Sequence, residues 1–95
     1  MVKINQRTFL KRMAELNGKR IRIDVEGMLK IEAEYCSISY SAGLVKIRDK
    51  ANNNFVTINL SFAYAILADN ENKEFQVFCD DDILFIIEEL PSKQE

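Results

Sequence analysis

The feature that most constrains the fold of this chain is an alternation of apolar with small or polar side chains between Val56 and Ile66. Its apolar members, which would share one face of an extended strand, are Val56, Ile58, Leu60, Phe62, Tyr64 and Ile66. As one straight strand, these residues would span about 36 Å, whereas 95 residues folded as one domain have a radius of gyration of roughly 12–13 Å. We therefore expect the strand to bend or break near Ser61. The alternative is a short helix that Ser61 caps and that runs to Ala68.

One helix is expected, at the N-terminus. Apolar residues recur every three or four positions within residues 5–17, Asn5 can cap the first turn, and Gly18 supplies a left-handed stop. After Gly18 the apolar period changes from about 3.6 to about 2, which is typical of half-buried strands. A phase change near Cys36 predicts a bulge or bend there. The remaining strands are expected at 21–25, 29–40, 44–48, 75–79 and 83–87.

These elements predict an α+β fold that is mostly β. The N-terminal helix (about 5–17) is followed by a β-rich body (about 19–90) and a short polar tail (91–95), all within a single domain over residues 1–95. Five to six mostly hairpin-connected strands would form a strongly bent antiparallel sheet or a small barrel. The run 83–87 is apolar on both faces, so we expect it to be central or covered on both sides.

Composition excludes several classes of site. The chain has no His, which removes Ser-His-Asp and Cys-His nucleophilic sites, His-containing zinc sites and the commonest general base near neutral pH. Cys36 and Cys79 are isolated within apolar, strand-like runs, which favours reduced, buried thiols over a redox pair. The N-terminus turns polar at once, so no secretory signal is expected, and the longest uncharged stretch, 51–68, is too polar to cross a bilayer. We therefore expect a cytoplasmic protein that has no membrane partner.

The acidic run Asp80–Asp82 is the most metal-like feature of the sequence. An EF-hand loop that began at its first residue would need glycine at the sixth position and glutamate at the twelfth, where the chain has Phe85 and Pro91. A solvated turn between two apolar strands is therefore expected, with no metal ion and no cofactor. Catalysis would require a cleft that joins this run to Glu32 or Glu34. Because nothing in the sequence supports such a site, we expect the protein to have no enzymatic activity.

Charge is distributed unevenly along the chain, although 13 Lys and Arg nearly balance 15 Asp and Glu. Residues 1–30 hold eight basic and three acidic residues, residues 31–68 hold three of each, and residues 69–95 hold two basic and nine acidic residues. Three interpretations compete. The two ends can pair within the chain, they can meet between subunits or partners, or the basic end can bind an anionic partner such as nucleic acid.

The placement of aromatic residues argues against nucleic acid. Phe55, Phe62 and Tyr64 lie in a segment without Lys or Arg between Lys50 and Lys73. A platform for single strands instead interleaves basic and aromatic side chains on one exposed face. These aromatic residues are therefore expected in the core or in a protein interface.

The sequence thus favours a small non-enzymatic binding or regulatory module that acts through protein–protein contacts, with a homo-oligomer as one form of such contacts. Apolar side chains on both faces of 62–67 and 83–87 support this, because either barrel closure or a second chain must cover them. The alternative is a nucleic-acid-associated small barrel that uses the basic helix. The candidate basic contacts are Arg7, Lys11, Arg12, Lys19, Arg20 and Arg22. The candidate acidic contacts, to a partner or another subunit, are Asp80, Asp81, Asp82, Glu88 and Glu89.

Overall fold

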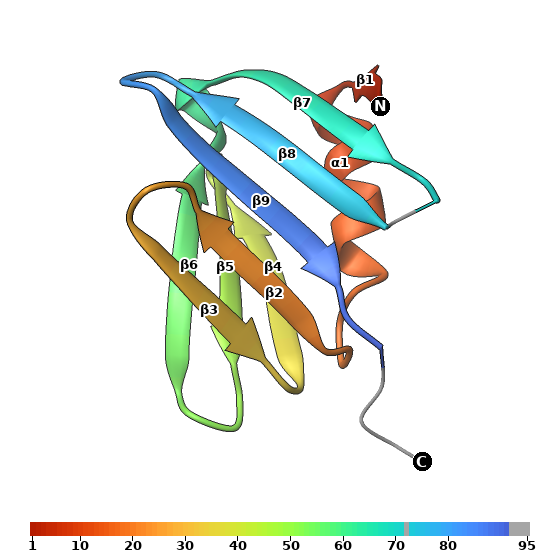
Figure 1. The fold of residues 1–95 in the computed structure, drawn as a ribbon, viewed down its shortest axis with the longest axis vertical. Coiled ribbons are helices and arrows are strands. Elements are labelled where there is room, and N and C mark those ends of the chain that lie inside the picture. Colours follow the sequence, from red (N-terminus) through yellow and green to blue (C-terminus); the bar gives the residue numbers. More distant parts are fainter. Residues whose placement is uncertain (72, 92–95) are drawn as a thin grey trace.

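The structure, a computed structural model, describes residues 1–71 and 73–91 of the chain (Figure 1). In that part, nine strands and one α-helix are joined by turns. The elements are, in order, β1 (Val2–Ile4), α1 (Gln6–Ala14), β2 (Ile21–Val25), β3 (Leu29–Ala33), β4 (Cys36–Ser41), β5 (Leu44–Asp49), β6 (Asn54–Asn59), the 3-10 turn η1 (Leu60–Phe62), β7 (Ala63–Asp69), β8 (Glu74–Cys79) and β9 (Ile83–Glu89). The fold is mostly β with one helix, as the apolar periods predict.

The strands form two antiparallel sheets. The larger sheet has the order β1-β7-β8-β9-β2-β3, and the smaller has the order β4-β5-β6. Figure 1 looks onto the larger sheet, with α1 behind β7 and β8 and the smaller sheet behind β9, β2 and β3. The helix and the smaller sheet thus cover one face of the larger sheet, and no described element lies on the other. The central position of β9 is one of the two alternatives predicted for 83–87 and is confirmed, while its outward face is not covered.

One core lies between the two sheets and the helix. Its fully buried side chains include Phe9 and Met13 from α1, Ile47 from β5 and Ile87 from β9. The ring of Phe9 meets that of Phe75 edge-on, with centroids 5.4 Å apart. Burial of such apolar side chains is the main favourable contribution to folding. Because both sheets contribute to this cluster, we expect them to unfold together.

The helix is shorter than the predicted span 5–17 and is not the first element. Asn5 caps it as expected, since its side-chain oxygen accepts a hydrogen bond from the Thr8 amide at 2.8 Å. The helix ends at Ala14, after which the chain turns and reaches Gly18 with a φ of 80°. The short strand β1, whose three residues alternate over too short a run to predict a strand, precedes the helix and pairs with β7.

The alternating run 56–66 breaks where the length argument predicts. β6 ends at Asn59, η1 turns the chain, and β7 begins at Ala63. The Asn59 side chain accepts a hydrogen bond from the Ser61 amide at 3.0 Å, which stabilises the turn. The alternative of a helix over 62–68 is wrong. β7 is hydrogen-bonded on both edges, to β1 and to β8, and this pairing outweighs the helix preference of its alanines.

The strands do not close into a barrel, and within the described residues they outnumber the five or six expected. The run 29–40 divides at Glu34 and Tyr35, where the chain leaves the larger sheet after β3 and enters the smaller one as β4. Of the bulge or bend predicted near Cys36, the bend is confirmed, and it carries the chain from one sheet to the other. The passage from β6 to β7 is the second change of sheet. Because β1, β3, β4 and β6 remain edge strands, the two sheets pack together without closing.

Candidate binding surfaces

The charges of the two chain ends meet in the larger sheet. β2 pairs with both β9 and β3, which places Arg22 directly between Glu88 and Glu32. The guanidinium of Arg22 lies 2.9 Å from a Glu88 oxygen and 3.4 Å from a Glu32 oxygen. The Arg20 guanidinium lies 3.2 Å from Glu32 and 3.8 Å from Glu34. Arg20 and Arg22 are therefore engaged within the chain, which is the first of the three interpretations of the charge distribution.

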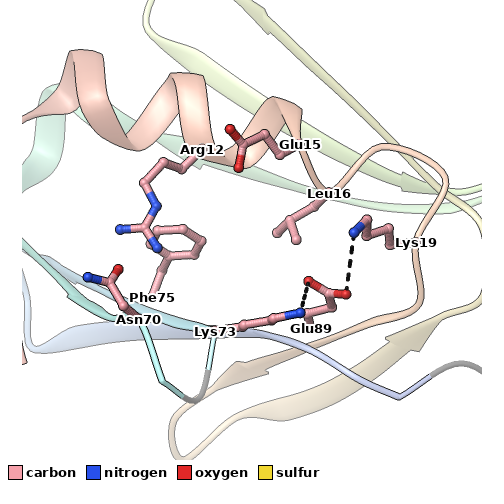
Figure 2. A pocket seen from close by; sticks show the side chains of 8 residues that line it. All are labelled: Arg12, Glu15, Leu16, Lys19, Asn70, Lys73, Phe75 and Glu89. Atoms are coloured by element: carbon pink, nitrogen blue, oxygen red, sulfur yellow. Dashed lines mark ion pairs between the residues drawn. The ribbon is translucent and has the colours of Figure 1, made fainter.

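Two further candidate cations, Arg12 and Lys19, line a pocket of about 240 Å³ between α1 and the β7–β8 connection. Figure 2 shows Glu89 between two lysines, with its carboxylate 3.6 Å from Lys19 and 3.9 Å from Lys73. The Arg12 guanidinium lies 5.1 Å from the centroid of the Phe75 ring. The lining residues are Arg12, Glu15, Leu16, Lys19, Asn70, Lys73, Phe75 and Glu89.

This pocket carries its own counterions. Its three cations are accompanied by the carboxylates of Glu15 and Glu89, which leaves the pocket a net charge of +1. A pocket with so small a net charge attracts an external anion only weakly. Sequence reasoning missed Lys73, which reaches Glu89 because the Glu89 amide donates to the Lys73 carbonyl at 3.1 Å. The other two candidate cations, Arg7 and Lys11, stay on the exposed side of α1. The predicted basic patch is thus divided among three places.

The candidate acidic residues also divide. Asp80–Asp82 form the turn at one end of β9, whereas Glu88 and Glu89 lie at its other end. The first amide of the turn donates to the Phe62 carbonyl at 2.9 Å. Glu32 lies in the same cross-strand row as Glu88, far from the turn along the strands. The carboxylates considered for catalysis are therefore not juxtaposed.

The uncovered face of the larger sheet carries a contiguous apolar surface. Cross-strand pairing places Ala65, Phe78 and Leu84 side by side on it, whereas in the next row the polar Gln76 lies between Leu67 and Ile86. The apolar residues of this face form the apolar patch, which consists of Tyr64, Ala65, Leu67, Phe78, Leu84 and Ile86. The Tyr64 ring packs against Phe78, with centroids 6.3 Å apart, and the members other than Tyr64 are half-buried although no described element covers them. The sequence indicated two-sided apolar runs, but not that the strand register would join them into one surface.

Acidic residues border the apolar patch at both ends. One outward row holds Asp69, Glu74 and Glu88, and it continues onto β2 as Arg22. The turn Asp80–Asp82 lies at the opposite end. Arg22 compensates Glu88, while the Glu74 carboxylate accepts a hydrogen bond of 2.9 Å from a neutral glutamine on the same strand. Lys3 on β1 lies beside Leu67 on this face, but the acidic residues outnumber Lys3 and Arg22, so the border of the patch is net negative.

Both cysteines are buried and free, as predicted. The Cys36 thiol donates to the Leu16 carbonyl, with 2.9 Å between sulfur and oxygen. Burial is the main cause that raises the pKa of both thiols, and the negative charges of Asp49 for Cys36 and Asp80 for Cys79 raise it further. Because a thiol is a poor nucleophile while it keeps its proton, neither cysteine is set up for chemistry at neutral pH.

Metal ligands, membrane-spanning helices and similarity to known proteins are three further indications of function. Within residues 1–71 and 73–91, no group of three His, Cys, Asp or Glu side chains could hold a metal ion. No helix in this part is long and apolar enough to cross a bilayer. Protein-family models, curated proteins and solved structures gave no match to this chain.

Proposed function

We propose that this chain is a cytoplasmic, non-enzymatic binding module that docks a protein partner on the apolar patch. The observation that carries the proposal is a set of apolar side chains on three adjacent strands that no described element covers. Removing apolar surface from water contributes about 25 cal/mol per Å², so a partner that covers this face gains free energy. Contiguous apolar surface on a folded domain most often serves recognition.

The borders of the patch indicate the chemistry of the partner. Asp69 and Glu74 lie at one end and Asp80–Asp82 at the other. A partner with Lys or Arg on both sides of an apolar centre is therefore electrostatically complementary to this face. The phosphate groups of a nucleic acid would be repelled by the same carboxylates. We expect a protein surface or segment in which basic residues flank apolar ones.

A second copy of the chain fits this face less well. Two-fold packing of patch on patch would bring acidic ends together whether the facing strands run parallel or antiparallel. Such like-charge juxtaposition across an interface costs several kcal/mol. A partner of different sequence is therefore favoured, and self-association is a separate outcome of the test.

Nucleic-acid binding by the basic helix has less support. Six cations on the helix and the segment after it were candidates for phosphate contacts. Lys19, Arg20 and Arg22 form ion pairs within the chain, and Arg12 lies over the Phe75 ring. A phosphate contact by any of these side chains would have to replace an existing partner, which lowers the net gain. The two remaining helix cations offer few phosphate contacts.

The test uses matched tyrosine variants. Tyr64 in the patch and Tyr40 on β4 are 64% and 51% exposed, so Tyr64→Asp and Tyr40→Asp introduce the same charge at exposed positions. A partner isolated from the native host with the wild-type chain is purified, and its affinity for each variant is measured by calorimetry. We expect Tyr64→Asp to weaken binding by about tenfold or more and Tyr40→Asp to leave it unchanged.

A second pair of variants probes the centre of the patch. Leu84→Asp should abolish binding, with Leu44→Asp on the smaller sheet as its control and circular dichroism as the check on folding. Equal affinity of the partner for patch and control variants would overturn the proposal. Light scattering of the wild-type chain without a partner measures whether the chain self-associates. A dimer that Tyr64→Asp dissociates would overturn the choice of a different partner and identify the occupant as a second copy.

A further inference from the structure

The outward face of the smaller sheet has a different chemistry. In the register, Ser39, Lys46 and Thr57 lie side by side on β4, β5 and β6, and Arg48 lies beside Phe55 in the next row. The outward residues form the cationic face, which consists of Ser37, Ser39, Ser41, Leu44, Lys46, Arg48, Phe55, Thr57 and Asn59. Most of them are exposed, although Thr57 and Asn59, at the β6 edge, also line a pocket of about 300 Å³ with Asp80 and Asp81 of the β8–β9 turn.

The two cations of this face have no carboxylate beside them on the outward positions of the three strands. The acid of β5, Asp49, points inward, where it is 3% exposed and accepts hydrogen bonds of 3.1 and 2.8 Å from two amide groups of the next turn. Arg48 donates to the Asn53 side-chain oxygen at 2.6 Å. The Lys46 ammonium lies 4.4 Å from the centroid of the Phe55 ring. These neutral partners leave both positive charges uncompensated.

Phe55 adds an exposed aromatic ring to the cationic face. It is 58% exposed, so of the two expected places, the core or a protein interface, the core is wrong for this residue. Its distance from Lys and Arg along the sequence argued against nucleic acid, but the strand pairing places Arg48 directly opposite it and Lys46 over its ring. Cations, hydroxyl groups and an aromatic ring therefore share one exposed sheet face.

We propose that the cationic face binds single-stranded nucleic acid. Lys46 and Arg48 are two positions apart on β5, hence about 7 Å apart, and both contact phosphate groups. A base stacks on the Phe55 ring in place of the Lys46 ammonium, which turns to the backbone of the nucleic acid. Ser39 and Thr57, on either side of Lys46, hydrogen-bond to sugar or base edges.

Two other anionic ligands fit this face less well. An acidic peptide would satisfy the two cations, but it would leave the exposed ring and the rows of hydroxyl groups unused. A nucleic-acid duplex keeps its bases stacked inside, so it offers the ring of Phe55 no partner. A single strand alone uses all three features, and the two other ligands serve as arms of the test.

The test measures the fluorescence anisotropy of labelled oligo-dT and oligo-U with the full chain at low salt. With two phosphate contacts, the logarithm of the association constant should fall against the logarithm of the salt concentration with a slope of about −1.4. The double variant Lys46→Glu with Arg48→Glu should abolish binding. The double variant Arg7→Glu with Lys11→Glu, the same charge change on α1, should retain it.

A second comparison isolates stacking from charge. Phe55→Ala should weaken binding by about fivefold or more without changing the salt slope. Tyr40→Ala is the control, because Tyr40 is a 51% exposed aromatic residue in the row of Val45 and Ile58, on the opposite face of the same sheet, and it should bind as the wild type does.

Four results would overturn the proposal. They are no binding by the wild type at low salt, loss of binding in the α1 double variant but not in the β5 double variant, unchanged affinity of Phe55→Ala, and equal affinity for a duplex or a polyglutamate peptide. Tighter binding of oligo-U than of oligo-dT would support the proposal and identify the 2′-hydroxyl as a contact. Equal binding of the two would support it and assign recognition to phosphate and base alone.

Discussion

The outward faces of the two sheets follow the same alternation and have opposite chemistry. On β7, β8 and β9 the larger sheet presents mainly apolar and acidic side chains, whereas the smaller sheet presents hydroxyl groups and cations. The basic segment 1–30 and the acidic segment 69–95 meet in β2 and β9, where they compensate each other. The balanced segment 31–68 contributes the cationic face, because Asp49 turns inward and the two glutamates before β4 pair with arginines. Strand register, not the charge of a segment, therefore decides what each surface presents.

The largest expected effects test whether one core supports both faces. Ile87 on β9 and Ile47 on β5 are 0% and 1% exposed, so Ile87→Ala and Ile47→Ala should each lower the free energy of unfolding by about 2–5 kcal/mol. Denaturant unfolding followed by circular dichroism should show one transition for each variant. Leu44→Ala, at an exposed position, is the control and should change stability by no more than about 0.5 kcal/mol. Two separate transitions would mean that the sheets are independent units.

The next effect concerns Asp49, the acidic residue of β5, whose carboxylate points inward and so does not lie on the cationic face. Asp49→Ala should lower the free energy of unfolding by about 1 kcal/mol, because it removes the acceptor of two part-buried hydrogen bonds from the following turn. Asp49→Asn keeps one side-chain oxygen and should recover part of this loss. The measurement is denaturant unfolding at neutral pH. Wild-type stability in Asp49→Ala would show that the inward position of this carboxylate contributes nothing to the fold.

A smaller effect is expected for the charge compensation on the larger sheet. The side chains of Arg22 and Glu88 are 34% and 30% exposed, so solvent screens their interaction. Glu88→Gln should therefore lower the free energy of unfolding by no more than about 1 kcal/mol, and by less at about 1 M salt. Glu26→Gln, on an exposed turn, is the control. A larger loss that persists at high salt would contradict the description of this pair as screened.

The smallest effect compares the thiols of the two sheets, Cys36 on β4 and Cys79 on β8. Because burial raises the pKa of each thiol above its ordinary value of 9.0, the unfolded chain loses these protons first as pH rises. Their contribution to stability is thus complete below about pH 9 and is lost as pH rises through the folded pKa. Denaturant unfolding from pH 7 to pH 10.5 should show a steeper alkaline loss for the wild type than for Cys36→Ala or Cys79→Ala. Equal slopes in all three chains would contradict the raised pKa.

Local patterns in the sequence predict most elements of the fold. The helical period, the cap at Asn5 and the break near Ser61 all follow from spacing and length, and the structure has each of them. The assignment of strands to sheets does not follow, because a period of two marks which face a residue occupies but not which strand lies beside it. The spacing therefore predicted only a bulge or bend near Cys36 and not the change of sheet at Glu34 and Tyr35, and one strongly bent sheet or a small barrel was expected where two sheets form.

The surfaces were less predictable than the fold for the same reason. The candidate charges were identified from their positions along the chain, but the ion pair of Arg22 with Glu88 depends on the pairing of β2 with β9. The apolar patch needs the register of β7, β8 and β9, and the contact of Lys46 with Phe55 needs that of β5 and β6. Such contacts between strands are not visible in one sequence.

The claim that register decides surface chemistry is tested most directly by an NMR titration of the labelled chain with oligo-dT at low salt. We predict that amide shifts gather on β4, β5 and β6, strongest around Lys46, Arg48 and Phe55, while the apolar patch and α1 stay unchanged. Shifts centred on Arg7 and Lys11 would show that the basic segment itself is the anion site. That result would contradict the account.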